Sequence, residues 1–185
     1  MDIMLVGITG TPGTGKTSVT ELLESRTSYR VIHINELIRE EKLYSEVDAQ
    51  RDCVVADMDR VDRRVREMAD SDDITILDSH LSHHIADSVI VLRTHPDILR
   101  ERLEKRRYSP EKIQENLEAE ALDIILCESA EWCDNVFEID TTSQSVERTL
   151  SDILSILEGL VLGREKELAD RYRPGSVDWS EDFFS

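Results

Sequence analysis

The octapeptide GTPGTGKT at residues 10–17 has the residue types and the spacing of a phosphate-binding loop, G-x-x-x-x-G-K-[ST]. Glycines let the backbone wrap around phosphates so that successive N–H groups point inward, and the N-terminus of the next helix adds partial positive charge. Lys16 can then reach the outer phosphates of ATP, and the Thr17 hydroxyl can hold Mg²⁺. Because an apolar stretch precedes the loop and a helical pattern follows it, an accidental glycine-rich turn is a poor alternative.

A carboxylate and three histidines follow a second apolar stretch. Asp78 ends the run 74–77, and the carboxyl ends of parallel strands meet at one sheet edge, so Asp78 is a candidate second anchor for Mg²⁺. The alternative is an ordinary turn or cap aspartate. His80, His83 and His84 lie close by, but their spacing does not establish the convergent ligand set of a zinc site.

A basic segment stands out in an acidic chain. The 185 residues carry 40 acidic and 22 basic side chains, a net charge of −18, which argues against polyanion binding over the whole surface. The segment from Arg93 to Lys112 contains seven basic and four acidic residues. Arg106 and Arg107 lie at a break between two helical patterns, where they could close on a nucleotide as a small lid. Salt bridges on a solvated helix are the alternative.

Alternating strands and helices must position these residues. Strands are expected at 3–8, 31–34, 74–77, 89–92 and 136–139, with helices between them. The pattern predicts an α/β fold with a parallel sheet covered by helices on both faces. The ten residues 79–88 are short for a parallel crossover. Local signals are Asn35 as an N-cap, Ser109-Pro110 as a helix start, a face formed by Ile113, Leu117, Ala121 and Ile124, and Gly163 as a helix stop.

One domain is expected at 1–163, followed by a polar C-terminal tail at 164–185. A frayed tail is favoured, although Trp179, Phe183 and Phe184 could dock on the body or on a partner. The three cysteines form no C-x-x-C pair, which predicts reduced thiols. With no long apolar run and no secretory signal pattern, we expect a cytoplasmic protein without membrane contact.

Several segments together resemble a known family, the archaeal adenylate-kinase-like proteins akin to the nuclear CINAP ATPase. The resemblance runs in register over about residues 1–160. The segments that carry it are residues 10–17, NELIREE at 35–41, Asp52-Cys53, Asp57-x-Asp59-Arg60, Asp78-Ser79-His80, Leu92-Arg93-Thr94 and ERLEKR at 101–106. One departure is Arg106-Arg107-Tyr108, where relatives often have Arg-Gly-Tyr.

The resemblance implies a P-loop kinase fold with a five-stranded parallel sheet, a monophosphate-binding flap near 33–56 and a lid near 105–115. In this family's scheme Arg39 grips the monophosphate and His80 positions the attacking water or the phosphoryl acceptor. Lys16, Asp78, His80 and Arg106 are the expected catalytic residues, and Thr17 and Asp78 the expected metal ligands. The residues expected to bind ATP are Gly13, Thr14, Gly15, Lys16, Thr17, Ser18 and Arg106.

The resemblance also implies an activity and a partner. Members of the family combine adenylate kinase activity with ATP hydrolysis and act in late small-subunit ribosome maturation through a small-subunit ribosomal protein. The expected function is therefore Mg²⁺-dependent phosphoryl transfer from ATP to AMP, with ATPase activity and only indirect contact with pre-rRNA. The alternative is an ATP-gated ribosome-assembly factor whose kinase activity is incidental. A kinase of shikimate or of a nucleoside is a third alternative, which shares the phosphate loop but does not predict the D-x-H segment. A GTPase is disfavoured because the sequence contains no N-K-x-D segment for reading guanine.

Overall fold

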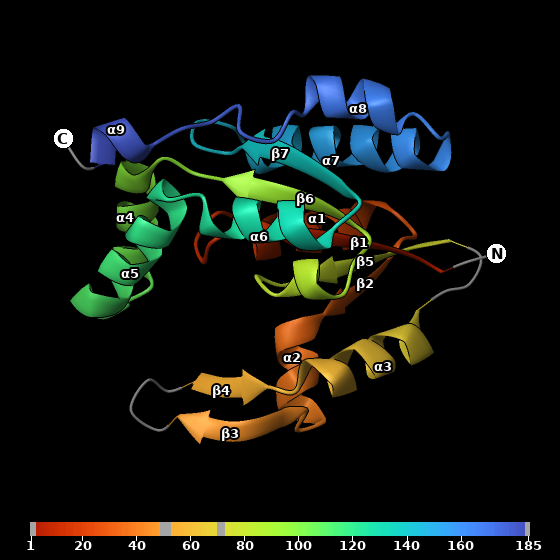
Figure 1. The fold of residues 1–185 in the computed structure, drawn as a ribbon, viewed down its shortest axis with the longest axis horizontal. Coiled ribbons are helices and arrows are strands. Elements are labelled where there is room, and N and C mark those ends of the chain that lie inside the picture. Colours follow the sequence, from red (N-terminus) through yellow and green to blue (C-terminus); the bar gives the residue numbers. More distant parts are fainter. Residues whose placement is uncertain (1–2, 49–52, 70–72, 184–185) are drawn as a thin grey trace.

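A five-stranded parallel sheet forms the centre of the computed structural model, which describes residues 3–48, 53–69 and 73–183. The expected α/β fold is confirmed. Apolar side chains of the central strands are buried on both faces, as a sheet covered on two sides requires. In spatial order the strands are β2 (Arg30–His33), β5 (Ile74–Asp78), β1 (Met4–Thr9), β6 (Ser88–Arg93) and β7 (Asn135–Asp140), shown in Figure 1.

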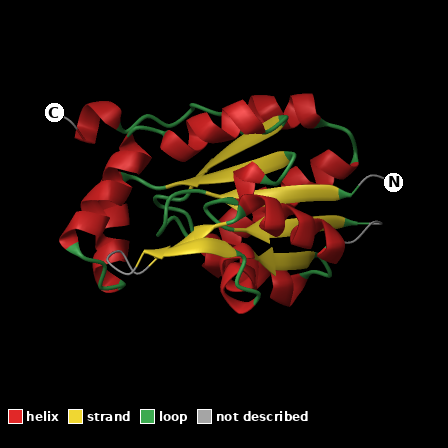
Figure 2. Cartoon of the chain, turned by 60° about the horizontal axis from the view of Figure 1, so that its bottom comes forward, coloured by secondary structure: helices red, strands yellow, loops and turns green. Residues whose placement is uncertain are grey.

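Helices cover the sheet in two layers (Figure 2). One face packs against α1 (Lys16–Arg26), α7 (Val146–Val161) and α8 (Glu165–Arg171). The other packs against α2 (Ile34–Glu40), α3 (Met58–Met68) and α6 (Ile124–Trp132). Within the described ranges, no helix combines the length and the apolar composition needed to cross a membrane.

Two hairpins project from this core on the side of the phosphate-binding loop. The antiparallel strands β3 (Tyr44–Asp48) and β4 (Cys53–Ala56) lie within the expected flap region, and residues 49–52 between them are outside the described part of the chain. Helices α4 (Pro96–Lys105) and α5 (Pro110–Ala121) form a helical hairpin around a small apolar cluster of their own. Ser109 caps α5 by accepting from the Lys112 amide, as the sequence predicts.

The short connection after β5 is accommodated by a single 3₁₀ turn, η1 (Ser82–His84). Strands β5 and β6 flank β1, so the connection passes over one strand only. Gly7 of β1 makes this possible, because a Cβ there would lie 2.7 Å from the Ser82 Oγ. The turn therefore rests directly on the sheet and needs no full crossover helix.

Two local predictions are wrong. Asn35 lies inside α2 rather than capping it, and its Oδ1 accepts a hydrogen bond from Ser79 Oγ at 3.0 Å. The apolar face of α5 does not continue to Ile124, because Asp123 adopts a left-handed conformation (φ 56°) and a new helix begins there. Ile124 is 41% exposed as a result.

The C-terminal segment packs against the body, so the expectation of a frayed tail is wrong for residues up to Phe183. Leu168 and Tyr172 of this segment are buried in the core beside α7. The Tyr172 carbonyl accepts from the Glu138 amide at 2.9 Å. The chain then runs along the sheet to the short helix α9 (Ser180–Phe183), beside α4 (Figure 1).

Candidate active site

The loop between β1 and α1 has a backbone that requires glycine. Gly10, Gly13 and Gly15 have φ angles of +138°, +97° and +100°, in the region where side chains are strained. A Cβ on Gly10 would also lie 2.4 Å from the Leu92 carbonyl oxygen. Gly15 precedes the first turn of α1, whose unpaired N–H groups and dipole favour a bound anion.

Lys16 directs its ammonium group into this loop. Its Nζ donates to the Gly10 carbonyl at 2.6 Å and to the Thr11 carbonyl at 3.0 Å. Burial lowers the pKa of Lys16 to about 8, and the charges of Asp78 and Glu120 oppose this effect. The loop thus places one cation beside the N-terminus of α1, an arrangement suited to a triphosphate.

Asp78 is held by neighbours that sequence reasoning missed. Its Oδ2 accepts from Thr20 Oγ1 at 3.1 Å and lies 2.8 Å from His33 Nδ1. The other ring nitrogen of His33 lies 3.2 Å from Glu24 Oε2. Burial disfavours the charged ring, but these two carboxylates prevail and raise the pKa of His33. The contact arises from the sheet itself, because His33 and Asp78 end β2 and β5 and pair with each other there.

The donor set of Thr17 and Asp78 fits the expected metal. Thr17 lies in the first turn of α1 with its side chain exposed, and Asp78 ends the adjacent strand β5. A hydroxyl and a carboxylate are both hard oxygen donors, which Mg²⁺ prefers. Mg²⁺ usually keeps several waters and is bound by one or two protein oxygens together with substrate phosphates, so two protein donors suffice.

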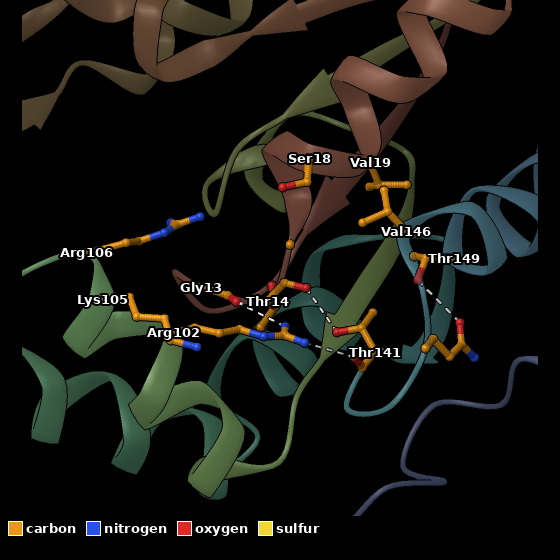
Figure 3. Close-up of a pocket in the computed structure, with 12 residues that line it drawn as sticks. Gly13, Thr14, Ser18, Val19, Arg102, Lys105, Arg106, Thr141, Val146 and Thr149 are labelled. Carbon is orange, nitrogen blue, oxygen red and sulfur yellow. Dashed lines mark hydrogen bonds between the residues drawn. The ribbon is translucent and has the colours of Figure 1, made fainter.

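A cavity of about 390 Å³ lies on one side of the loop (Figure 3). Val19 and Val146 form an apolar part of its wall, and Arg106 lines it from the end of α4. A mixed apolar and polar lining of this kind suits a nucleoside. The remaining lining residues are Gly13, Thr14, Gly15, Ser18, Arg102, Lys105, Thr141, Gln144 and Thr149.

A larger cavity, of about 710 Å³, lies on the other side of the loop and reaches the β3–β4 hairpin. It is lined by seven of the residues predicted to form the site, namely Gly13, Gly15, Lys16, Thr17, Arg39, His80 and Arg106. Gly13, Gly15 and Arg106 line both cavities, so the two meet at the phosphate loop. Asp78 lines neither, because it is buried at the end of β5.

His80 faces the larger cavity as a neutral imidazole. Burial, together with the nearby Lys16 ammonium, lowers the pKa of His80 to about 4. Near neutral pH the ring therefore offers one donor and one acceptor nitrogen and carries no charge. Such a group can orient a reacting oxygen, but it is a weak base.

Arg106 directly follows α4 as its C-cap, and the sequence reasoning missed an arginine within this helix. The Arg102 Nη1 donates to the Gly13 carbonyl at 3.3 Å, and its Nη2 donates to the Thr141 carbonyl at 3.2 Å. Arg102 thereby connects the phosphate loop to the end of β7 (Figure 3). Its position one helical turn before Arg106 is the signal that could have indicated it.

Arg93, the first of the seven bases in the basic segment, is paired inside the protein. Its side chain is buried, 1% exposed, and contacts three carboxylates. Nε donates to Glu120 Oε1 at 2.9 Å, Nη1 donates to Glu138 Oε1 at 2.7 Å, and Nη2 contacts Asp123. Its charge is thus compensated inside the protein and is not available to a nucleotide.

Comparison with known proteins gives matches over nearly the whole chain. A family model described as an AAA domain matches residues 6–123. A Methanosarcina acetivorans protein named “Putative adenylate kinase” is 53% identical over 182 residues, covering 95% of this chain and 97% of the relative. A Methanocaldococcus jannaschii protein of the same name is 41% identical over 182 residues, covering 98% of this chain and 96% of the relative.

Solved structures with the same fold are more distant in sequence. A shikimate kinase from Bacteroides thetaiotaomicron aligns with a TM-score of 0.54 at 18% identity, over 84% of this chain and 99% of the other. A deoxyadenosine kinase from M. mycoides aligns with a TM-score of 0.54 at 16% identity, over 84% of this chain and 100% of the kinase. These likenesses establish the P-loop kinase fold.

Proposed function

The chain belongs to the AAA-domain family and to a group of archaeal relatives named “Putative adenylate kinase”, and on this premise we propose that it transfers the γ-phosphoryl group of ATP to AMP. One observation carries the proposal. The phosphate loop separates two cavities, and the larger one is lined both by Lys16 and Thr17 of the loop and by Arg39 and His80. A donor nucleotide and an acceptor can therefore meet at the loop.

In this proposal ATP occupies the smaller cavity and the loop. Its base and ribose lie against Val19 and Val146, and its phosphates accept hydrogen bonds from the backbone of residues 13–18. When ATP binds, the Lys16 ammonium group gives up its hydrogen bonds to the loop carbonyls and donates to the outer phosphates instead. Mg²⁺, held by Thr17 and Asp78, supplies charge neutralisation on the phosphates when bound.

AMP occupies the larger cavity, where Arg39 binds its phosphate. An oxygen of that phosphate attacks the γ-phosphorus in line, the bond from the γ-phosphorus to the β–γ bridging oxygen breaks, and two molecules of ADP result. The attacking oxygen carries no proton near neutral pH, so the reaction needs no strong general base. This agrees with the low pKa of His80, which orients the acceptor, while Arg106 offsets the charge that develops between the cavities.

We also propose slow ATP hydrolysis when water occupies the acceptor position. His80, which lines the cavity proposed for the acceptor, would then orient that water. A role in small-subunit ribosome maturation, with a ribosomal protein as partner, is supported only by the resemblance of segments such as 35–41 and 78–80. A cytoplasmic location likewise stays a prediction.

A coupled assay of ATP consumption tests the proposal with AMP, CMP, GMP and UMP as acceptors and with no acceptor. We expect AMP to give the highest rate and the reaction without acceptor the lowest. Lys16→Ala should abolish both activities, whereas Lys166→Ala, an exposed lysine on α8, should abolish neither. Phosphoryl transfer that persists in Lys16→Ala would overturn the assignment.

A further inference from the structure

A second group of ligand side chains lies outside both cavities. His83 and His84 of η1 and Glu128 of α6 each offer one ligand atom, and these atoms all lie within 4.8 Å of one another. We propose that this trio, the η1–α6 cluster, binds one divalent transition-metal ion of the zinc class and thereby ties η1 to α6. The proposal does not depend on the kinase activity.

The distances are close to those of a metal site. A tetrahedral ion with ligand bonds of about 2.0–2.1 Å separates neighbouring ligand atoms by roughly 3.3 Å. His83 Nε2 and Glu128 Oε2 are already 3.1 Å apart. His84 must approach by roughly 1.5 Å at most, from the 4.8 Å limit, to complete three corners. The Glu128 side chain is 45% exposed, so it can adjust and leave the fourth position open to water.

Neighbouring groups contact both imidazoles and orient that of His83. His83 is 2% exposed, and its Nδ1 lies 3.5 Å from Thr9 Oγ1, so its Nε2 is directed toward Glu128. The ring of Trp132 meets the His84 ring edge-on, with centroids 5.4 Å apart. A hydrogen-bond partner on the non-ligating nitrogen of a histidine, as Thr9 is for His83, orients its ligating nitrogen.

The ligand chemistry selects the class of ion. Two imidazoles with one carboxylate suit Zn²⁺ and its transition-metal neighbours, whereas Mg²⁺ prefers oxygen ligands alone. Without a metal, one proton between His83 Nε2 and Glu128 accounts for their contact. Metal binding replaces that proton, which passes to solvent, and brings in His84 as the third ligand. The hydrogen bond between His83 and Glu128 does not explain why the His84 imidazole lies beside them.

Titration with Co²⁺ and Zn²⁺ tests the proposal on the full chain in excess Mg²⁺. In a Trp179→Phe background Trp132 is the only tryptophan, so its fluorescence reports on the neighbouring His84. We expect one equivalent of Co²⁺ to quench this fluorescence and to give the visible absorption of a four-coordinate ion. Zn²⁺ should displace the Co²⁺ and raise the temperature of unfolding.

Variants at the two more accessible ligands locate the site. His84→Gln and Glu128→Gln should each weaken Co²⁺ binding at least tenfold and leave the far-ultraviolet circular dichroism unchanged. His95→Gln, at the start of α4, and Lys16→Ala should bind Co²⁺ as the parent does. Absence of a saturable Co²⁺ signal, or equal binding by the double variant His84→Gln/Glu128→Gln, would overturn the proposal.

Discussion

Two arginines near the phosphate loop illustrate how position decides the role of a charge. Arg39 is exposed and lines the larger cavity, whereas Arg93 is enclosed by carboxylates. An exposed guanidinium can bind a phosphate in a bidentate manner. A buried guanidinium with all its carboxylate partners stabilises the fold, and moving it to bind a ligand would cost several kcal/mol of stability, about the cost of breaking a buried ion pair.

Arg39→Ala should weaken binding of the acceptor AMP and leave binding of the donor ATP unchanged. We expect the KM for AMP to rise at least tenfold, because a charge-assisted contact with the phosphate is lost, while the KM for ATP stays within twofold. Initial rates over a matrix of ATP and AMP concentrations measure both. Arg63→Ala, an exposed arginine on α3, is the matched control. An equal rise in both KM values would argue against Arg39 as an acceptor ligand.

Glu120→Gln should destabilise the fold. Glu120 accepts hydrogen bonds from Arg93 Nε at 2.9 Å, from the Thr94 amide at 2.9 Å and from Thr11 Oγ1 at 2.5 Å. Removing one charge of a buried pair costs about 3–5 kcal/mol, and Arg93 keeps two other carboxylates, so we expect about 3 kcal/mol. Urea denaturation measures this. Glu118→Gln, on the exposed face of α5, should change stability by less than about 0.5 kcal/mol.

The residues that were predicted and those that were missed differ in how they are brought together. GTPGTGKT is contiguous, so its chemistry is readable from local spacing. His33 reaches Asp78 through strand pairing, and Glu128 reaches His83 through packing of α6 on η1. No local spacing encodes those contacts, because they depend on which strands and helices become neighbours. The internal pairing of Arg93 was not predicted for the same reason.

At the scale of elements, apolar runs predicted all five strands of the sheet, and the central strands β5, β1 and β6 are buried along nearly their whole length, as strands covered on both faces are. Ile34, expected in the second strand, instead begins α2. The β3–β4 hairpin was not predicted as strands, and part of it falls outside the described residues. Helix α6 was missed because its start depends on the left-handed Asp123. The lid prediction near 105–115 stays a prediction, although a break between α4 and α5 does fall at Arg106 and Arg107.

The contact between the phosphate loop and α4 can be tested at Gly13. A Cβ there would lie 2.8 Å from Leu99 Cδ1, at a φ of +97°. Gly13→Ala should therefore displace the loop from α4 and raise the KM for ATP at least tenfold, as measured by initial rates. Gly163→Ala is the control, because its φ is +65° and no atom lies within 4 Å of a Cβ.

The two glycine variants separate backbone strain from loop displacement. Gly163→Ala should cost about 1 kcal/mol of stability, from the left-handed backbone alone, with no change in the KM for ATP. Gly13→Ala should change nucleotide binding more than stability. If both variants lower stability alike and neither alters the KM for ATP, the packing of the loop on α4 is not required for binding.

At the scale of the whole molecule, a chain of buried contacts links the C-terminal segment to the phosphate loop. The Ser176 amide donates to Glu138 Oε2 at 2.7 Å, and the other oxygen of Glu138 accepts from Arg93. Arg93 pairs with Glu120, which accepts from Thr11 in the loop. The tail expected to fray is thus connected to the candidate site through four side chains.

Truncation after Gly163 tests that connection. It removes the apolar contacts of Leu168 and Tyr172, each 7% exposed and each contributing about 2 kcal/mol, and it removes amide donors from Glu138. We expect a loss of about 4 kcal/mol or more in urea denaturation. Leu168→Ala, which leaves the Ser176–Glu138 contact in place, should cost about 3 kcal/mol with an unchanged KM for ATP, whereas the truncation should raise that KM several-fold. A truncated chain that keeps both its stability and its KM would show that the segment packs without supporting the loop.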